Sequence, residues 1–431
     1  MLRRLIRKIM NRCVLALAVA ALPSAGLGQK ANPPAAGADF AIKPVITFSE
    51  DESWVSVRYG KYDVKIPRPV VSPWKYRVEG TVYWVDPNGN DLGEGTKASP
   101  LRTVSKAVAI CKPGDIVYIN PGEYVEAIHL RRYGLPGRPI IFSCAPGALG
   151  KVRIKLPKAN ALSGAGGYPL DTSVVTIHNA AHIWINGLVV EGCLGQPWAP
   201  ARSAAGNPNG IMWENGPCAG CRATNNICFN NLHCGLKDQS GGTVDLFLQG
   251  NICFHNGRSG LDHGIYMPGN GATIDGNVLF DNTGWGVHCY STPSNLTVTR
   301  NVCFYDNYGG IVMGGRNSLI CNNVTYGGIY GIMFNETSRE NTVKNNIAFH
   351  SQYLDIFFGA DGAETFDYND FIKIVNTRSP TKPGPNCIRT DPLFTSPASG
   401  DFTLQNESPC LHAGTPVSVS KSGVVPNMGA Y

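Results

Sequence analysis

The feature that most constrains this chain is a short phrase that recurs six times between residues 225 and 349. In each copy a polar residue or glycine precedes an asparagine, which is followed by Ile or Val, a variable residue, and Phe or Tyr. The central residues are Asn226, Asn251, Asn277, Asn301, Asn323 and Asn346, spaced 25, 26, 24, 22 and 23 residues apart. A period of this length indicates a solenoid, and apolar runs this short predict strands rather than helices.

A second phrase, out of step with the first, places a glycine before an aliphatic residue in every repeat. Its glycines are Gly210, Gly235, Gly264, Gly286, Gly310 and Gly331. Each repeat therefore contains at least two short strands separated by turn residues. Equivalent strands of successive coils would pair in parallel, and each repeat asparagine would hydrogen-bond to the asparagine one coil away and to turn backbone.

We therefore predict an all-β fold, a right-handed parallel β-helix, because parallel crossover connections are right-handed in about 98% of cases. Two other repeat architectures fit less well. A β-propeller blade needs about 40 to 45 residues, and a leucine-rich repeat needs leucines at fixed offsets that this sequence lacks.

The N-terminus has the layout of a secretory signal peptide, in which basic residues precede an apolar run from Cys13 to Leu22 and small residues up to Gly28. The run is far shorter than the roughly 20 residues that a membrane-spanning helix needs, so we predict a secreted or periplasmic protein without a membrane span. The predicted segments are a signal peptide (1–28), a linker with an N-terminal strand segment (29–75), the β-helix domain (76–415) and a closing segment (416–431).

The charge of the chain gives no support for nucleic-acid binding. The formal charge is +6, and the signal peptide contains five basic and no acidic residues, so its removal leaves +1. We expect a monomer.

The cysteines suggest packing more than cross-linking. Of fourteen cysteines, Cys13 leaves with the signal peptide, and Cys228, Cys253 and Cys303 occupy the same repeat position, which favours stacked thiols. Cys387 and Cys410 are a candidate disulfide, as export would permit.

Three further segments carry a resemblance to a known superfamily. Residues 83–91 read Tyr-Trp-Val-Asp-Pro-Asn-Gly-Asn-Asp, residues 113–119 read Pro-Gly-Asp-Ile-Val-Tyr-Ile, and residues 391–394 read Asp-Pro-Leu-Phe. Over residues 80 to 431 the chain resembles secreted right-handed parallel β-helix proteins of the pectate-lyase-like superfamily, which includes polysaccharide lyases and mannuronan epimerases. The resemblance implies the fold and an acidic polysaccharide as substrate.

A short amphipathic stretch within this opening segment predicts a capping helix. From Thr103 to Cys111 the apolar residues Val104, Ala107, Val108 and Cys111 recur at helical spacing. A helix here would cover the open strand edge of the first coil, which would otherwise invite aggregation.

Strand alternation selects the candidate catalytic residues. If the aliphatic residue after each second-phrase glycine faces the core, the next residue faces solvent. The outward column then contains Met212, Lys237, Tyr266, His288, Val312 and Met333. We predict Lys237, Tyr266, His288 and the nearby His263 as catalytic residues, because titratable side chains on adjacent coils indicate a functional site.

These side chains suit proton abstraction from a uronic-acid polymer. Lyase cleavage needs neutralisation of the substrate carboxylate, a base for the proton beside it, and an acid for the leaving oxygen. Lys237 would act as base or carboxylate clamp, His288 or His263 as base, and Tyr266 or Tyr290 as acid. A C5-epimerase would use the same proton abstraction and differ in how the carbanion is quenched.

Six further residues are predicted to bind substrate. Trp213, Trp285 and Tyr290 would offer aromatic faces to sugar rings. The remaining three are the carboxylates Glu214, Asp238 and Asp262, which also leave a glycoside hydrolase open, because that reaction needs two carboxylates about 5 to 10 Å apart.

Two alternatives concern metal and catalysis. Gly235-Leu236-Lys237 resembles the lysine strand of a calcium-dependent pectate-lyase family, but the preceding coil has no aspartate cluster. We therefore predict no metal or other cofactor, and only a weak calcium site at Asp238 and Asp262 stays open. A non-catalytic glycan-binding solenoid also stays open, in which Lys237 merely solvates an exposed strand.

Overall fold

The structure of the protein is a computed structural model. It describes residues 44–70, 76, 79–157, 173–193, 208–239, 243–290, 292–359, 362–377, 379–417 and 426–431. The predicted signal peptide (1–28) and the linker up to residue 43 lie outside the described residues. Within those ranges no helix is long and apolar enough to cross a membrane.

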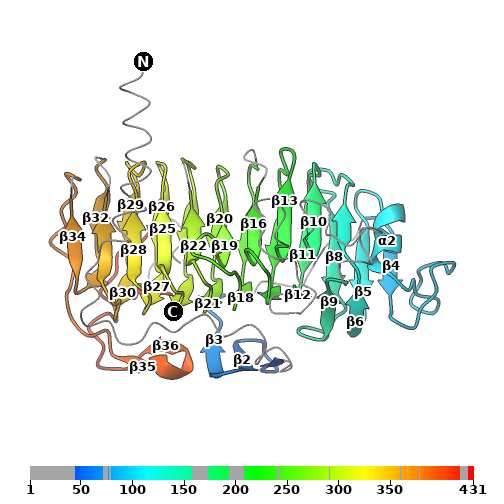
Figure 1. Cartoon of the computed structure of the whole chain (residues 1–431), viewed down its shortest axis with the longest axis horizontal. Helices are drawn as coiled ribbons and strands as arrows, with labels where there is room; N and C mark the ends of the chain where they lie inside the picture. Colours follow the sequence, from blue (N-terminus) through cyan, green and yellow to red (C-terminus); the bar gives the residue numbers. More distant parts are fainter. Residues whose placement is uncertain are drawn as a thin grey trace, which may run out of the picture. The chain divides into compact units, whose positions relative to one another are not determined.

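Most strands belong to three parallel sheets that the chain visits in turn (Figure 1). Sheet I has eleven strands: β4 (Val82–Val85), β5 (Ile116–Ile119), β8 (Ile140–Cys144), β11 (Ile183–Asn186), β14 (Arg222–Thr224), β17 (Phe247–Gln249), β20 (Thr273–Asp275), β23 (Thr297–Thr299), β26 (Leu319–Cys321), β29 (Thr342–Lys344) and β32 (Thr365–Asp367). Sheet II has ten strands: β6 (Gly122–Val125), β9 (Val152–Lys155), β12 (Val189–Glu191), β15 (Ile227–Phe229), β18 (Ile252–Phe254), β21 (Val278–Phe280), β24 (Val302–Phe304), β27 (Val324–Tyr326), β30 (Ile347–Phe349) and β33 (Asp370–Phe371). Sheet III has ten strands: β7 (Ile128–Leu130), β10 (Val175–His178), β13 (Ile211–Glu214), β16 (Leu236–Asp238), β19 (Ile265–Tyr266), β22 (Trp285–Cys289), β25 (Gly309–Met313), β28 (Tyr330–Phe334), β31 (Leu354–Phe358) and β34 (Ile374–Asn376).

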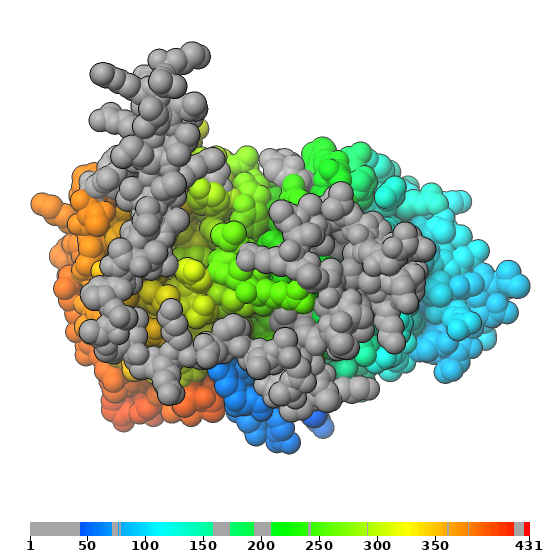
Figure 2. Space-filling model, viewed as in Figure 1, coloured from blue at the N-terminus to red at the C-terminus, as the bar shows by residue number. Residues whose placement is uncertain are grey.

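From β5 onward each coil contributes one strand to each sheet, which confirms the predicted parallel β-helix. In Figure 2 the colours of the described coils change in sequence order, from cyan through green and yellow to orange. The last coil strand ends at Asn376, so the predicted β-helix range of 76–415 also contains a terminal hairpin that is not a coil.

The repeat asparagines form the ladder that the sequence predicted, at the turn between sheets I and II. Each Nδ2 donates to the Oδ1 of the asparagine in the next coil over 2.9 to 3.1 Å, from Asn226 through to Asn369. Each Oδ1 also accepts the backbone N–H of the preceding coil's asparagine. The residue before each asparagine has positive φ, which explains why that position is glycine or mostly polar.

A second ladder lies at the turn between sheets II and III and ends on an aspartate. It runs from Asn231 through Asn256 and Asn282 to Asp306, over 2.8 to 2.9 Å. Asp306 is 1% exposed, and burial raises the pKa of its carboxyl group well above the ordinary value. Its second oxygen has no hydrogen-bond partner among the described residues.

The predicted cap over the first coil is α2 (Val104–Ile110). Thr103 is its N-cap and accepts the backbone N–H of Lys106, and Val104, Ala107 and Val108 are buried in the core of the coils. The carboxylate of Glu126 accepts the backbone N–H groups of Val104 and Ser105, which the sequence did not reveal. Carboxylates are favourable at this end because the first N–H groups of a helix have no intrahelical partner.

The N-terminal and C-terminal segments cover the outer face of sheet II (Figure 1). The N-terminal segment is an antiparallel sheet of β1 (Val45–Phe48), β2 (Trp54–Tyr59) and β3 (Tyr62–Pro67). The C-terminal segment contains β35 (Phe394–Ser396), the short 3-10 helix η1 (Pro397–Ser399) and β36 (Asp401–Leu404). In Figure 2 both segments, coloured blue and orange-red, lie along the same lower side of the coils.

These segments bury the aromatic residues that end the first four repeat phrases. The rings of Phe229, Phe254, Phe280 and Phe304 stack at 4.9 to 5.1 Å on the outside of the coils and are at most 1% exposed. The variable residue before each of them points into the coil core instead. An uncovered row of this kind would be a large apolar patch, so the terminal segments are part of the folded domain.

The cysteines are free throughout the described chain. Cys228, Cys253 and Cys303 are fully buried at matching positions of sheet II, but only Cys228 and Cys253 are neighbours, because Leu279 separates Cys253 from Cys303. The predicted Cys387–Cys410 disulfide is wrong. The thiol of Cys410 contacts the Asp370 carboxylate at 3.3 Å, and Cys387 lies near Asp367.

We predict that Asp306→Asn stabilises the protein by about 1 to 2 kcal/mol at neutral pH. The folded state holds a proton on Asp306 that the unfolded chain releases above its ordinary pKa of about 3.9. Wild-type stability therefore falls as pH rises from that value toward the raised folded pKa, and the asparagine removes this loss. Urea unfolding at pH 5 and pH 8 measures the difference, which should be larger at pH 8.

Asn282→Asp is the matched control, because it adds a second buried carboxyl group to the same ladder. It should destabilise the protein at pH 8. An Asp306→Asn variant that is less stable than wild type at both pH values would contradict this account.

Candidate active site

The outward column of sheet III has the register that strand alternation predicted. Lys237 pairs with Tyr266 and Tyr266 with His288 on the consecutive strands β16, β19 and β22. All three side chains are partly exposed, whereas the aliphatic residues that precede them are fully buried. Adjacent strands lie about 4.8 Å apart, so the three side chains stand side by side on one face.

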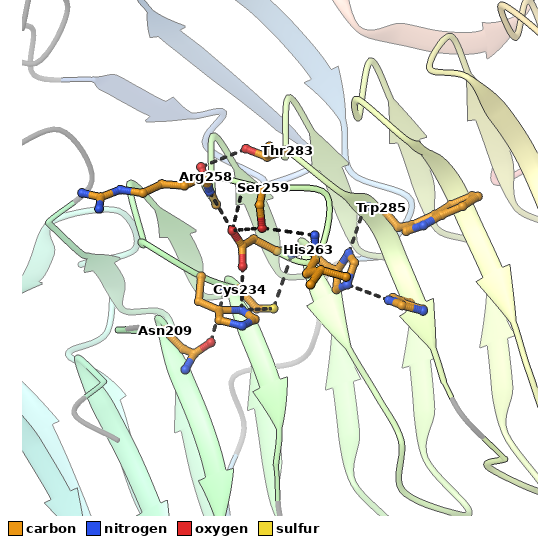
Figure 3. Close-up of polar contacts among 12 residues, drawn as sticks. Asn209, Cys234, Arg258, Ser259, His263, Thr283 and Trp285 are labelled. Atoms are coloured by element: carbon orange, nitrogen blue, oxygen red, sulfur yellow. Dashed lines mark hydrogen bonds and ion pairs between the residues drawn. The ribbon is translucent and has the colours of Figure 1, made fainter. Parts of the chain in front are cut away.

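His263 lies behind this column and holds His288 by a direct contact. His263 Nδ1 accepts the backbone N–H of Trp285 over 3.1 Å, as Figure 3 shows, and His263 Nε2 lies 2.6 Å from His288 Nδ1. The backbone bond leaves the proton of His263 on Nε2, which therefore donates to His288. His288 Nδ1 is an acceptor, so neutral His288 carries its own proton on Nε2.

Burial keeps both histidines neutral. His263 is 1% exposed, and burial lowers its pKa well below the ordinary value, with a further contribution from the neighbouring His288. Burial lowers the pKa of His288 to about 3. The predicted role of His263 as a base in contact with substrate is therefore wrong, because both its ring nitrogens are occupied inside the protein. It is a positioning residue.

Tyr266 and Lys237 complete the exposed part of the site. The Tyr266 ring lies 5.8 Å from the His263 ring and 5.4 Å from the His288 ring, and burial raises the pKa of its phenol. Lys237 Nζ lies 6.0 Å from the centre of the Tyr266 ring. Tyr290 is 38% exposed, and its ring lies 5.4 Å from that of His288. A protonated phenol and an amine therefore lie on the same open face.

The predicted substrate-binding aspartates lie inside the protein. Asp238 is fully buried, because it follows Lys237 in the strand and alternation turns it inward, and it accepts the hydroxyl of Thr243 over 2.6 Å. Asp262 is 1% exposed and accepts the backbone N–H groups of Arg258 and Ser259. Neither side chain faces a substrate, so these two predictions are corrected.

Three other predicted contacts are also internal. Trp213 is fully buried in the coil core, since it follows the outward Met212 in β13. Glu214 is 7% exposed, and its carboxylate lies 2.9 Å from Nδ1 of His178. Trp285 is 6% exposed and stacks on Tyr330 at 6.0 Å. Of the ten predicted site residues, the structure leaves Lys237, Tyr266, His288 and Tyr290 with appreciable exposed surface.

Sequence reasoning missed the turn that supports the site. The Cys234 thiol accepts the backbone N–H of His263 over 3.4 Å and lies 2.9 Å from His233 Nδ1. Asp262 Oδ1 also lies 3.4 Å from Nδ1 of His233. Cys234 is fully buried, and burial raises the pKa of its thiol to about 12, so it acts as a structural thiol (Figure 3). No spacing signal identifies Cys234, because it contacts its partners across the coil turn.

No metal site is apparent in the described part of the chain, where no three His, Cys, Asp or Glu side chains are grouped to hold an ion. Asp238 and Asp262 are buried, with Asp238 Oδ1 bonded to Thr243 and Asp262 Oδ2 bonded to backbone N–H groups, so they do not offer the six- to eight-oxygen shell that calcium needs.

Comparison with known proteins agrees with the fold. Residues 258–377 match the family described as "Right handed beta helix region". Residues 87–131 match a second family, described as "Protein of unknown function (DUF1565)". A curated relative, the uncharacterized protein YwoF of Bacillus subtilis (strain 168), is 25% identical in an alignment that covers 77% of this chain and 92% of YwoF.

Two solved structures share the fold. The pectate lyase Pel9A is 19% identical, with 82% of this chain and 96% of that chain covered at a TM-score of 0.53. A glycoside hydrolase is 10% identical, with 76% and 99% covered at a TM-score of 0.50. The protein is thus a right-handed parallel β-helix with an open face on sheet III. It shares this fold with the pectate lyase Pel9A.

We predict that the histidine pair makes the fold sensitive to acid. The unfolded chain protonates His288 below its ordinary pKa of about 6.5, whereas folded His288 stays neutral down to about 3. Stability is thus fully present above about pH 6.5 and is lost as pH falls toward 3, by up to about 1.4 kcal/mol per pH unit for each such group.

Thermal unfolding of wild type and His288→Gln between pH 7 and pH 4.5 measures this contribution. The midpoint should fall less steeply with acid in the variant. His412→Asn, which removes an exposed histidine, is the control and should keep the wild-type slope. Equal slopes for wild type and His288→Gln would contradict the burial of His288 as a neutral group.

Proposed function

We propose that this protein is an exported carbohydrate-active enzyme, a polysaccharide lyase or C5-epimerase that removes the proton beside the carboxylate of a uronic-acid polymer. The observation that carries the proposal is the exposed row of an amine, a phenol and an imidazole on adjacent strands of sheet III. The fold shared with the pectate lyase supports a polymer as substrate.

Lys237 is the proposed base. The structure leaves neutral His288 with its proton on Nε2, so the exposed end of that ring is a donor rather than a proton acceptor. His263 has no free nitrogen, and Tyr266 holds its phenolic proton because burial raises its pKa. The Lys237 amine is then the group in the column that suits proton abstraction from C5.

The side chains of His288 and Tyr266, beside Lys237, carry out the remaining steps. His288 Nε2–H donates to the substrate carboxylate and stabilises the charge that develops when C5 loses its proton. In the lyase version the electron pair forms the C4–C5 double bond, and Tyr266 gives its proton to the departing O4. In the epimerase version the C4–O4 bond stays intact, and C5 regains a proton from solvent water on the opposite face.

The structure favours this reaction over glycoside hydrolysis. Asp238 and Asp262 are buried and bonded within the protein, and Glu214 is 7% exposed beside His178. Hydrolysis would need two carboxyl groups on opposite sides of the glycosidic bond. The carboxyl groups of Asp238, Asp262 and Glu214 do not reach a bound glycosidic bond.

Lys237→Ala should lower kcat by about 10²- to 10⁴-fold, the usual contribution of a general base. Pectate, alginate and glycosaminoglycans form the substrate panel. Absorbance of the unsaturated product reports cleavage, and the stereochemistry of recovered uronates reports epimerisation. Lys237→Arg separates the two roles of the lysine, because arginine keeps the charge of a clamp but cannot serve as the base.

Lys344→Ala is the matched control, since Lys344 is also a partly exposed strand lysine but lies in sheet I. It should keep wild-type activity. Wild-type protein that changes no polymer of the panel would remove the enzymatic proposal. If it still bound one of them, the non-catalytic glycan-binding alternative would stand instead.

A further inference from the structure

A group of aromatic rings continues the open face of sheet III beyond the proposed active site. We call Trp285, Tyr330, Tyr353 and Phe357 the aromatic shelf. Tyr330 contacts the other three, with ring centres 6.0 Å from Trp285, 5.8 Å from Tyr353 and 6.0 Å from Phe357. Tyr353 is 50% exposed, and Tyr330 and Phe357 are partly exposed.

The shelf is joined to the active site through Trp285. The backbone N–H of Trp285 fixes the tautomer of His263, while its ring extends away from His263 (Figure 3). That ring reaches Tyr330 two coils further on by passing over Gly309, where a Cβ atom would lie 2.7 Å from the indole. Because Gly309 has no side chain, the ring of Trp285 can lie over it and connect the active site to the aromatic shelf.

The shelf also follows the line of the catalytic column. Phe357 lies in the same register column as His288, three strands further along sheet III. The residues between them in this column are Val312 and Met333. At the usual strand spacing this is about 14 Å, a distance that only an oligosaccharide of several units spans. Sugar rings present apolar C–H faces that stack on aromatic side chains, and Tyr adds a hydroxyl for their polar edge.

Taking the function proposed above as the starting point, we propose that the aromatic shelf is a distal saccharide-binding site. It takes the units of the polymer chain that lie several residues from the reacting uronate, and it holds them by their C–H faces. The four shelf side chains carry no charge, so carboxylate recognition belongs to the Lys237 end of the face. The protein would therefore bind long oligosaccharides more tightly than short ones.

The test is calorimetric binding of tri- and heptasaccharides prepared from polygalacturonate and from alginate, in parallel with the activity panel. Tyr353→Ala and Phe357→Ala should each weaken heptasaccharide binding by about tenfold and leave trisaccharide binding and turnover at saturation unchanged. Tyr353 is the safer site, because half its surface is already exposed. Tyr133→Ala, at a tyrosine that is 52% exposed elsewhere, is the control and should bind as wild type does.

The outcomes separate this proposal from the previous one. Wild-type protein that cleaves a polymer while both shelf variants bind the heptasaccharide normally would overturn the shelf alone. Shelf-dependent binding without turnover would overturn the enzymatic proposal and keep the shelf. Failure of wild type to bind any heptasaccharide would overturn the shelf as a saccharide site. So would sedimentation showing that the wild-type protein is a dimer and that Tyr353→Glu dissociates it, because the shelf would then contact a second copy of the chain.

Discussion

The hydrogen-bonded stacking of asparagines is the interaction on which the rest of this structure depends. Each repeat asparagine from Asn226 to Asn346 donates to the asparagine of the next coil and accepts a backbone N–H from the previous one, and its amide also bonds strand or turn carbonyls. An amide side chain offers both donors and an acceptor, so the same residue repeats indefinitely without a mismatch. Because a slip by one residue would bury the wrong face of every strand, the ladder fixes which side chains reach the surface together.

The three sheets have different outer faces, and this difference assigns their roles. The outer face of sheet II carries the row of phenylalanines and is closed by the terminal segments. Tyr431 at the C-terminus donates its hydroxyl to the carbonyl of Pro67, and Tyr62 in the N-terminal hairpin donates to Asp281. Sheet III keeps a partly exposed row of titratable and aromatic residues instead. The apolar face stabilises the fold, and the polar face remains available for a ligand.

The proposed site is held rigid by elements that never touch the substrate. The thiol of Cys234 accepts the backbone N–H of His263, the backbone of Trp285 fixes the imidazole of His263, and that imidazole in turn fixes His288. This arrangement costs solvation, since the buried imidazole of His263 and the partly exposed imidazole of His288 must both stay neutral. It also orients the exposed nitrogen of His288 in advance, and preorganised donors stabilise developing charge better than mobile ones.

The sequence by itself determined the coil period, the asparagine ladder, the capping helix and the column of Lys237, Tyr266 and His288, because each depends on a repeat or on the two-residue period of a strand. The same alternation also places the side chains of Asp238 and Trp213 inside the coil, although the sequence analysis predicted that they bind substrate. Only the tertiary structure decided that His263 faces inward, that the repeat phenylalanines are covered by the chain termini, and that Trp285 reaches Tyr330 across Gly309. Those contacts depend on how turns bend and on residues one or more coils away, and neither is encoded in local periodicity.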